Sequence, residues 1–224
     1  MSKKHIEHFV VNLKRRPDRL SNFLNTCPIE EKINVIYGFD GKNIDEENID
    51  EVKLMSKFPT FSPGEIGCFL SHLRIWRMIV KDNIKHSLIF EDDAIFSDDF
   101  LSKFNLVLGD LKDDMDILYI GGRFEPNFIM NSNYYLNISD NVIQHKNDDF
   151  DLNVNGYIFC RTTHSYIISY NLAKILIDIF DNESTANIAL DHWIILNVFK
   201  NNIKIYDSLP LLCHSPFISD SDIR

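Results

Sequence analysis

Short apolar runs alternate along this chain with longer stretches in which apolar residues recur every three or four positions. Short runs are typical of buried strands, and the longer periodic stretches are typical of helices with one apolar face. The pattern predicts strands at residues 6–13, 33–37, 88–90, 116–120, 166–169 and 203–206. It predicts helices at residues 17–25, 62–81, 171–180 and 188–200. Because strands and helices alternate, we expect an α/β fold with a mainly parallel central sheet and helices on both faces.

The sequence marks some boundaries of these elements more clearly than others. Ser62 and Glu65 have the S-x-x-E spacing of a capping box, and Pro63 falls at the first helical position, so the helix at 62–81 is well defined. Residues 45–57 are charged and indicate a surface helix or a loop. Residues 125–150 are rich in Asn and Asp and predict a long, partly mobile loop.

The composition indicates a globular protein with an acidic surface. Hydrophobic residues make up 45% of the 224 residues, which excludes wholesale disorder and allows one large domain or two small ones. The net charge of −10 argues against a general nucleic-acid-binding protein, which needs a basic surface. No apolar run approaches the roughly 20 residues of a membrane span, and the first apolar run is typical of a strand and not of a signal peptide. We therefore expect a cytoplasmic protein.

The cysteines argue against a cysteine-rich metal site. Four of them lie far apart without C-x-x-C spacing, which indicates free thiols in a reducing compartment: Cys27, Cys68, Cys160 and Cys213. Within the helix at 62–81, Glu65, Cys68 and His72 fall near one line. A zinc site formed by these three residues is disfavoured, because Glu65 is expected to cap the helix.

The segment SLIFEDDAIF at residues 87–96 carries the strongest chemical signal. Glu91, Asp92 and Asp93 directly follow a buried strand, and clustered charges next to a core cost several kcal/mol unless they are neutralised. A hard divalent cation with oxygen ligands would neutralise them and would also hold phosphates. The alternative is a solvated acidic exit from the strand without a function. Both interpretations remain open from this segment alone.

Two other turns carry candidate binding residues. Lys14, Arg15, Arg16 and Arg19 follow the first strand, where arginines can grip phosphate or carbonyl oxygens. Asp40 and Gly41 end the second strand, where Asp40 can accept hydrogen bonds and Gly41 permits a close backbone approach. A solvated basic turn and a plain strand-ending turn are the alternatives.

Several motifs together resemble glycosyltransferase family 25, which includes lipooligosaccharide galactosyltransferases and procollagen galactosyltransferases. They are VVNLKRRPDRL at 10–20, FDG at 39–41, GEIGCFLSHLRIW at 64–76 and LIFEDDAIF at 88–96. The resemblance continues more weakly through 165–178, LDHWI at 190–194 and YDSLPLL at 206–212. It implies one GT-A-type domain over 1–224, with a nucleotide-sugar-binding half at 1–122 and an acceptor-side half at 123–224.

The resemblance also implies a reaction. The family transfers a hexose from a UDP-sugar, usually UDP-galactose or UDP-glucose, to a hydroxyl of a glycan or a hydroxylated protein. It inverts the anomeric centre and uses Mn²⁺ or a similar cation such as Mg²⁺. The E-D-D segment takes the part of the D-x-D motif of this fold, and a cation there stabilises the departing diphosphate.

Carried onto this chain, the resemblance assigns roles residue by residue. Asp93 is the expected metal ligand, and Glu91 contacts metal-bound water or the donor ribose, while Asp92 serves in either way. Donor binding is expected from residues spread over four segments: Asn12, Arg16, Arg19, Asp40, Gly41, Ser71 and His72. Asp191 in LDHWI is the expected general base, and the alternative for it is a favourable charge at a helix N-terminus. His214 is a candidate further metal ligand, although the family often has another residue type there.

Two alternatives come from other functional classes. The carboxylates are also typical of a metal-dependent phosphohydrolase, which would need further Asp and His ligands at defined spacing. The second alternative is a sugar-binding module without catalytic activity. Retention of E-D-D together with Asp191 favours the transferase.

Overall fold

The fold is known from a computed structural model that describes residues 5–111, 114–122, 135–146 and 161–215. In this part of the chain, eight strands form one sheet in the order β2-β1-β3-β8-β5-β9-β7-β6. They are β2 (Ile33–Tyr37), β1 (Glu7–Asn12), β3 (His86–Glu91), β8 (Ser165–Ser169), β5 (Ile117–Tyr119), β9 (Ile205–Ser208), β7 (Val142–His145) and β6 (Tyr135–Asn137). The pairings make β8 and β7 run opposite to the six others. The expected α/β architecture, with most strands in one direction, is confirmed.

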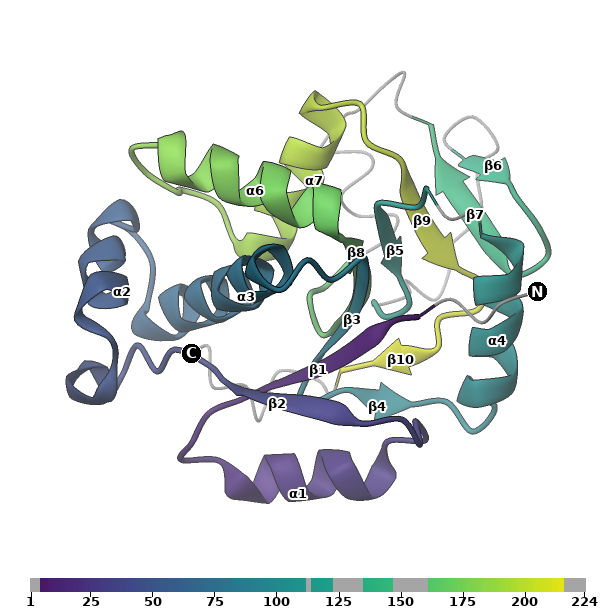
Figure 1. The fold of residues 1–224 in the computed structure, drawn as a ribbon, viewed down its shortest axis with the longest axis horizontal. Coiled ribbons are helices and arrows are strands. Elements are labelled where there is room, and N and C mark those ends of the chain that lie inside the picture. The colour runs from purple at the N-terminus through teal and green to yellow at the C-terminus, as the bar shows by residue number, and fades with distance from the viewer. Residues whose placement is uncertain (1–4, 112–113, 123–134, 147–160, 216–224) are drawn as a thin grey trace.

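Helices cover both faces of the sheet (Figure 1). The helices α3 (Pro63–Lys81), α6 (Tyr170–Asn182) and α7 (Leu190–Lys200) pack on one face through an apolar cluster. The helices α1 (Pro17–Thr26) and α4 (Phe100–Asp110) pack on the other face through a second cluster. Alternate residues of β3 point into the two clusters, Leu88 and Phe90 into one and Ile89 into the other, so the strand is buried on both sides as a central strand should be.

The helix α3 forms as its sequence predicts. The Ser62 hydroxyl accepts a hydrogen bond from the Glu65 amide at 3.3 Å, and the Glu65 carboxylate accepts one from the Ser62 amide at 2.8 Å. This reciprocal pair satisfies amides that the first helical turn leaves unpaired. The charged stretch before it folds as α2 (Ile49–Leu54) between two short 3₁₀ turns, Ile44–Glu46 and Met55–Lys57.

Three elements differ from the sequence-based expectation. The helix α4 was not predicted, and neither was the small sheet formed by β4 (Ile95–Phe96) and β10 (Cys213–His214). The loop predicted for 125–150 is wrong for 135–146, where β6 and β7 pair as a hairpin at the edge of the sheet. The rest of that range lies outside the described residues. These strands have only three and four residues, too few for a periodic pattern to reveal them, and β7 is stabilised by pairing with β9.

None of the helices in the described ranges is long and apolar enough to cross a membrane.

A buried ion pair lies at β9, next to the β6–β7 hairpin at the edge of the sheet. The Arg161 guanidinium donates two hydrogen bonds to the Asp207 carboxylate, at 2.8 and 2.5 Å, and both side chains are buried. His145 is fully buried nearby, and its Nδ1 donates to the Lys146 carbonyl at 2.7 Å. Burial and, after it, the charge of Arg161 lower the pKa of His145 to about 4, against the opposing effect of the hydrogen bond to the Lys146 carbonyl.

Acidification is expected to destabilise the fold through His145. Between pH 6.5 and about 4 the unfolded chain binds a proton at this side chain that the folded chain does not, so this contribution is complete above pH 6.5 and is lost as the pH falls. His145→Asn keeps a donor for the carbonyl and removes the titration. Urea unfolding at pH 7 and pH 4 should show the wild type losing roughly 3 kcal/mol more than this variant. The exposed His5→Asn variant should behave as wild type, and an equal loss in His145→Asn would contradict the assignment.

Candidate active site

The candidate site is a pocket at the carboxyl ends of the neighbouring parallel strands β1 and β3. The loop after β2 and the N-terminal half of α3 close its other side. Nine of the twelve side chains predicted from the sequence line it: Asn12, Arg19, Asp40, Gly41, Ser71, His72, Glu91, Asp92 and Asp93. Ligand sites in open α/β sheets commonly lie at this edge. The structure therefore brings these four separate segments of the chain together at one pocket.

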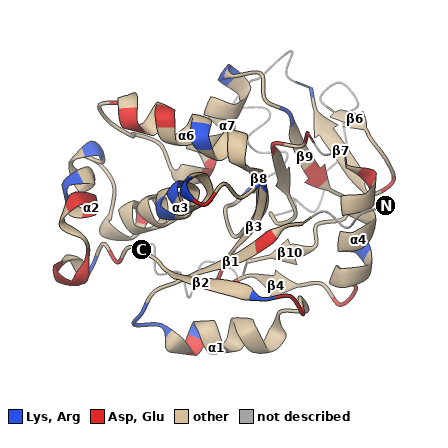
Figure 2. Ribbon diagram, viewed as in Figure 1, with Lys and Arg blue, Asp and Glu red and all other residues tan. Residues whose placement is uncertain are grey.

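Arg19 and Asn12 hold the two aspartates of the triplet. One Arg19 nitrogen lies 2.5 Å from Asp92 Oδ1 and 3.1 Å from Asp93 Oδ2. Asn12 Nδ2 donates to Asp92 Oδ2 at 2.6 Å and to the Arg16 carbonyl at 2.8 Å. Lys and Arg gather at the turn between β1 and α1 and at the start of α1 (Figure 2), and Arg19 from this helix reaches the acidic end of β3. Part of the negative charge is neutralised by the protein itself, which the sequence did not predict.

Burial nevertheless dominates the titration of both aspartates. It raises the pKa of Asp92 to about 6, against the opposing charge of Arg19. Burial and, after it, the neighbouring charge of Glu91 together raise the pKa of Asp93 to about 7, against the opposing charge of Arg19. The aspartates are therefore crowded carboxylates that an additional positive charge would stabilise.

Glu91 turns away from the aspartates toward the helix α3. Its Oε1 accepts a hydrogen bond from the Thr163 hydroxyl at 2.6 Å and lies 3.3 Å from His72 Nε2. Burial raises the pKa of Glu91, but His72 and Thr163 outweigh it and lower that pKa to about 2. Glu91 is therefore ionised and fixed in position, in contrast to its two neighbours.

A chain of buried hydrogen bonds orients His72. Trp76 Nε1 donates to the Tyr166 hydroxyl at 3.0 Å, and this hydroxyl lies 2.8 Å from His72 Nδ1. If the Tyr166 hydroxyl in turn donates to Nδ1, Nε2 carries the proton and donates to Glu91, so each group in the chain is satisfied. All three rings belong to the core face of α3 and β8, which makes their positions rigid.

The oxygen atoms of this pocket fit a hard divalent cation. Asn12 Oδ1 and Asp93 Oδ1 are both buried and have no hydrogen-bond partner. Buried acceptors without partners are rare, and carboxylate and amide oxygens are the ligands that Mg²⁺ and Mn²⁺ accept. Asp93 is the better placed of the predicted ligands for this oxygen site, since its Oδ1 is buried without a partner next to the segment that holds Asn12, whereas Glu91 turns toward His72 and Thr163.

Ser71 and Gly41 shape the wall formed by the loop after β2. The Ser71 hydroxyl accepts from the Phe39 amide at 2.8 Å and donates to the Gly67 carbonyl at 2.6 Å, so it joins this loop to α3. A Cβ atom on Gly41 would lie 1.9 Å from the Pro63 carbonyl oxygen. Gly41 therefore permits a close approach as predicted, but the partner is the protein's own helix.

Gly41→Ala is expected to lower the free energy of unfolding by about 1–3 kcal/mol, because the loop or the helix must move to admit the methyl group. Chemical denaturation measures this directly. Gly109→Ala in α4 is the matched control, since nothing lies within 4 Å of its Cβ position. It should stabilise the protein by roughly 0.5–1 kcal/mol through helix propensity. An unchanged midpoint for Gly41→Ala would show that the contact is not rigid.

Three of the predicted residues lie outside the pocket lining: Arg16, His214 and Asp191. Arg16 pairs with the exposed Asp18 at 3.0 Å, while its neighbour Arg15 lines the pocket. His214 is exposed on β10, opposite Ile95, and its role as a metal ligand stays a prediction.

Asp191 lies in the first turn of α7, where its Oδ1 accepts from the His192 amide at 2.8 Å. Burial raises the pKa of Asp191, and the charge of Glu91 contributes to the rise. In turn, the charge of Asp191 contributes to raising the thiol pKa of Cys68, which lines the pocket. Asp191 thus lies within electrostatic reach of the pocket, although it does not line it.

Comparison with known proteins assigns the chain to a family. The family described as "Glycosyltransferase family 25 (LPS biosynthesis protein)" matches residues 5–194. The chain belongs to glycosyltransferase family 25. This match covers the pocket residues of β1, α3 and β3 and also Asp191, while His214 falls beyond it.

Curated relatives in family 25 are much longer than this chain. Procollagen galactosyltransferase 2 of Mus musculus is 29% identical over 129 residues, which are 52% of this chain and 21% of that protein. Procollagen galactosyltransferase 1 of Danio rerio is 32% identical over 129 residues, again 52% and 21%. Inactive glycosyltransferase 25 family member 3 of Mus musculus is 31% identical over 129 residues, 52% of this chain and 22% of that protein. The chain spans about a fifth of their length, and active and inactive members match it equally well.

Among solved structures, the inositol-1-phosphate CTP transferase from T. maritima matches with a TM-score of 0.40 at 14% identity, over 94% of this chain and 70% of that chain. The family 25 assignment rests on the sequence match and not on this likeness.

Sequence reasoning did not assign several residues that line or support this pocket. Arg15 lines the pocket and pairs with Asp40 at 2.7 Å, and Lys42 lines it as well. Arg15 was among the candidate basic residues of its turn but was not assigned to donor binding, and Lys42 directly follows the predicted Asp40 and Gly41. Thr163 and Tyr166 hold Glu91 and His72 from 72 and 94 residues away, and no local pattern marks them.

Proposed function

We propose that this protein is an inverting, metal-dependent glycosyltransferase that moves a hexose from a UDP-sugar to a hydroxyl of a glycan or a protein. Galactose is the favoured hexose and glucose the alternative. The observation that carries the proposal is the convergence of nine residues predicted to bind the donor or the metal on one pocket, with the E-D-D segment at the end of β3. The expected cytoplasmic location stays a prediction.

The pocket offers two kinds of contact to a diphosphate. Asn12 and Asp93 would hold a Mn²⁺ or Mg²⁺ ion, which when bound supplies positive charge to the departing diphosphate. Arg15 and Lys42 add fixed positive charge to the same pocket. Asp40, which pairs with Arg15, keeps that guanidinium in place. These contacts would strengthen as the bond between the sugar and the diphosphate breaks, and this difference lowers the barrier.

Asp191 is proposed to act on the acceptor. As the acceptor oxygen forms its bond to the anomeric carbon, an Asp191 oxygen takes the hydroxyl proton, and UDP leaves with the electrons of the broken bond. A pKa raised by burial makes Asp191 a stronger base than an exposed aspartate. Attack from the face opposite to UDP inverts the anomeric centre.

Incubation with a panel of UDP-sugars and Mn²⁺, followed by detection of released UDP, tests the proposal. Release of UDP from one hexose donor, together with an inverted configuration in the product by NMR, is the expected result. Release of phosphate from simple phosphate esters would instead identify a phosphohydrolase. Metal-dependent UDP binding without any turnover on acceptor mixtures would identify an inactive binding module, as in the inactive relatives.

A further inference from the structure

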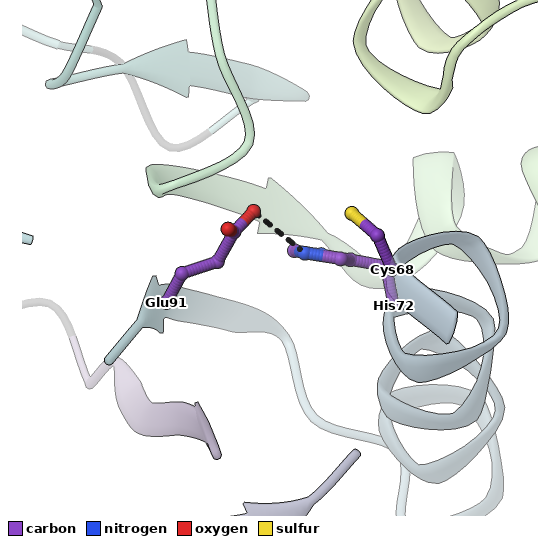
Figure 3. Close-up of side chains that lie close together, drawn as sticks. All are labelled: Cys68, His72 and Glu91. Carbon is purple, nitrogen blue, oxygen red and sulfur yellow. Dashed lines mark hydrogen bonds and ion pairs between the residues drawn. The ribbon is translucent and has the colours of Figure 1, made fainter. Parts of the chain in front are cut away.

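A second group of ligand atoms lies on the α3 side of the pocket. Cys68 Sγ, His72 Nε2 and a Glu91 carboxylate oxygen all lie within 4.8 Å of one another (Figure 3). Cys68 and His72 are one turn apart on α3, and Glu91 reaches them from the end of β3. All three side chains line the pocket. The helical spacing places Glu65 near the same line as Cys68 and His72, but the Glu65 carboxylate is engaged in the capping box. The carboxylate that lies beside Cys68 and His72 is that of Glu91.

We propose that Cys68, His72 and Glu91 form a binding site for a thiophilic divalent cation of the zinc class. One thiolate, one imidazole nitrogen and one carboxylate oxygen are ligands that zinc accepts together, and three protein ligands leave a fourth position open. Ligand atoms around a tetrahedral zinc lie roughly 3–4 Å apart, so a shift of about 1 Å completes the triangle. Because all three residues line the pocket, a ligand in the open position would be reached from it.

The surroundings of His72 suit a metal-binding imidazole. Metal-binding histidines usually donate their second ring N–H to a fixed acceptor, which sets the ring orientation. The Tyr166 hydroxyl, 2.8 Å from His72 Nδ1 and held by Trp76, would take this acceptor role once a metal occupies Nε2. Binding would free Nε2 for the metal by placing the ring proton on Nδ1, and the Cys68 thiol proton would leave to solvent.

This site differs in chemistry from the oxygen site at Asn12 and Asp93. Sulfur and imidazole ligands select soft and borderline cations, whereas Mg²⁺ prefers oxygen alone. The two sites share the pocket, so a zinc ion bound to Cys68 would draw Glu91 further from the aspartates and inhibit donor binding. This last consequence rests on the proposed function, whereas the metal site itself does not.

Cobalt titration of the purified chain, without any sugar nucleotide, tests the site. Wild-type protein should bind one Co²⁺ with a near-ultraviolet sulfur-to-cobalt charge-transfer band, and Zn²⁺ should abolish the band while Mg²⁺ at the same concentration should not. Cys68→Ser should lose the band and weaken zinc affinity by at least about 10-fold. Cys27→Ser is the matched control, because Cys27 is a partly buried free thiol packed against the opposite face of the sheet, and it should keep the band.

If Cys68→Ser misfolds, the cobalt titration of the wild-type protein still decides whether the site exists. Absence of the charge-transfer band in folded wild type, or its persistence in folded Cys68→Ser, would overturn the site. Neither result depends on glycosyltransferase activity, so a failed site and a failed proposed function are told apart.

Discussion

Asp93→Asn should reduce turnover of the UDP-sugar by roughly 10³-fold and abolish the dependence of UDP affinity on Mn²⁺. The substitution keeps the size of the side chain and removes the charge from the oxygen that lies buried without a partner. Steady-state kinetics and UDP titrations with and without Mn²⁺ measure both effects. The fold should not weaken, because burial and the charge of Glu91 raise the pKa of Asp93 and make its ionised form costly.

Asp98→Asn is the matched control for this substitution. Asp98 is an exposed aspartate five positions further along the same segment, and the change should leave turnover and UDP affinity as in wild type. Wild-type activity in a folded Asp93→Asn protein would remove Asp93 from the metal site. Equal losses in both variants would indicate an effect of overall charge.

Asp191→Asn should lower kcat by roughly 10²- to 10⁴-fold while UDP affinity stays within a factor of about two, because a general base acts on the acceptor and not on the donor. The raised pKa of Asp191 gives the activity of the wild type an acidic limit, which should disappear in the variant. The same UDP-release assay across pH 5–8 measures both quantities.

Asp178→Asn controls for the loss of a carboxylate elsewhere in the second half of the chain. Asp178 is exposed and pairs with Lys174 on α6, and such pairs contribute little. A loss of UDP affinity in Asp191→Asn that equals its loss of kcat would assign Asp191 to donor binding or to helix stability. Activity close to wild type would leave the base to another residue.

Local signals in the sequence predict the elements that form the pocket. The capping box fixes the start of α3, and the apolar run before E-D-D fixes the end of β3. Because β1 and β3 are parallel neighbours, residues that follow the two strands meet at one edge, which is why Asn12 and Arg19 reach Asp92. Period, caps and strand direction thus account for the meeting of these segments at one edge, whereas the individual pairings of Asn12 and Arg19 with the aspartates were not predicted.

The sequence did not allow us to predict contacts between distant segments of the chain. The strand β8 inserts between β3 and β5 and runs against both, and no residue of its apolar run encodes that place. Thr163, which precedes β8, reaches Glu91 only because of this insertion. The fixed position of Glu91 therefore depends on sheet order, and sheet order is a property of the whole chain.

A crystal structure of the protein with Mn²⁺ and UDP tests the central claim most directly. We predict manganese density bonded to Asp93 Oδ1 and to both phosphates of UDP, with the nucleotide inside the pocket between β1 and α3. UDP bound elsewhere, or bound in this pocket with the metal distant from Asp93, would contradict the account.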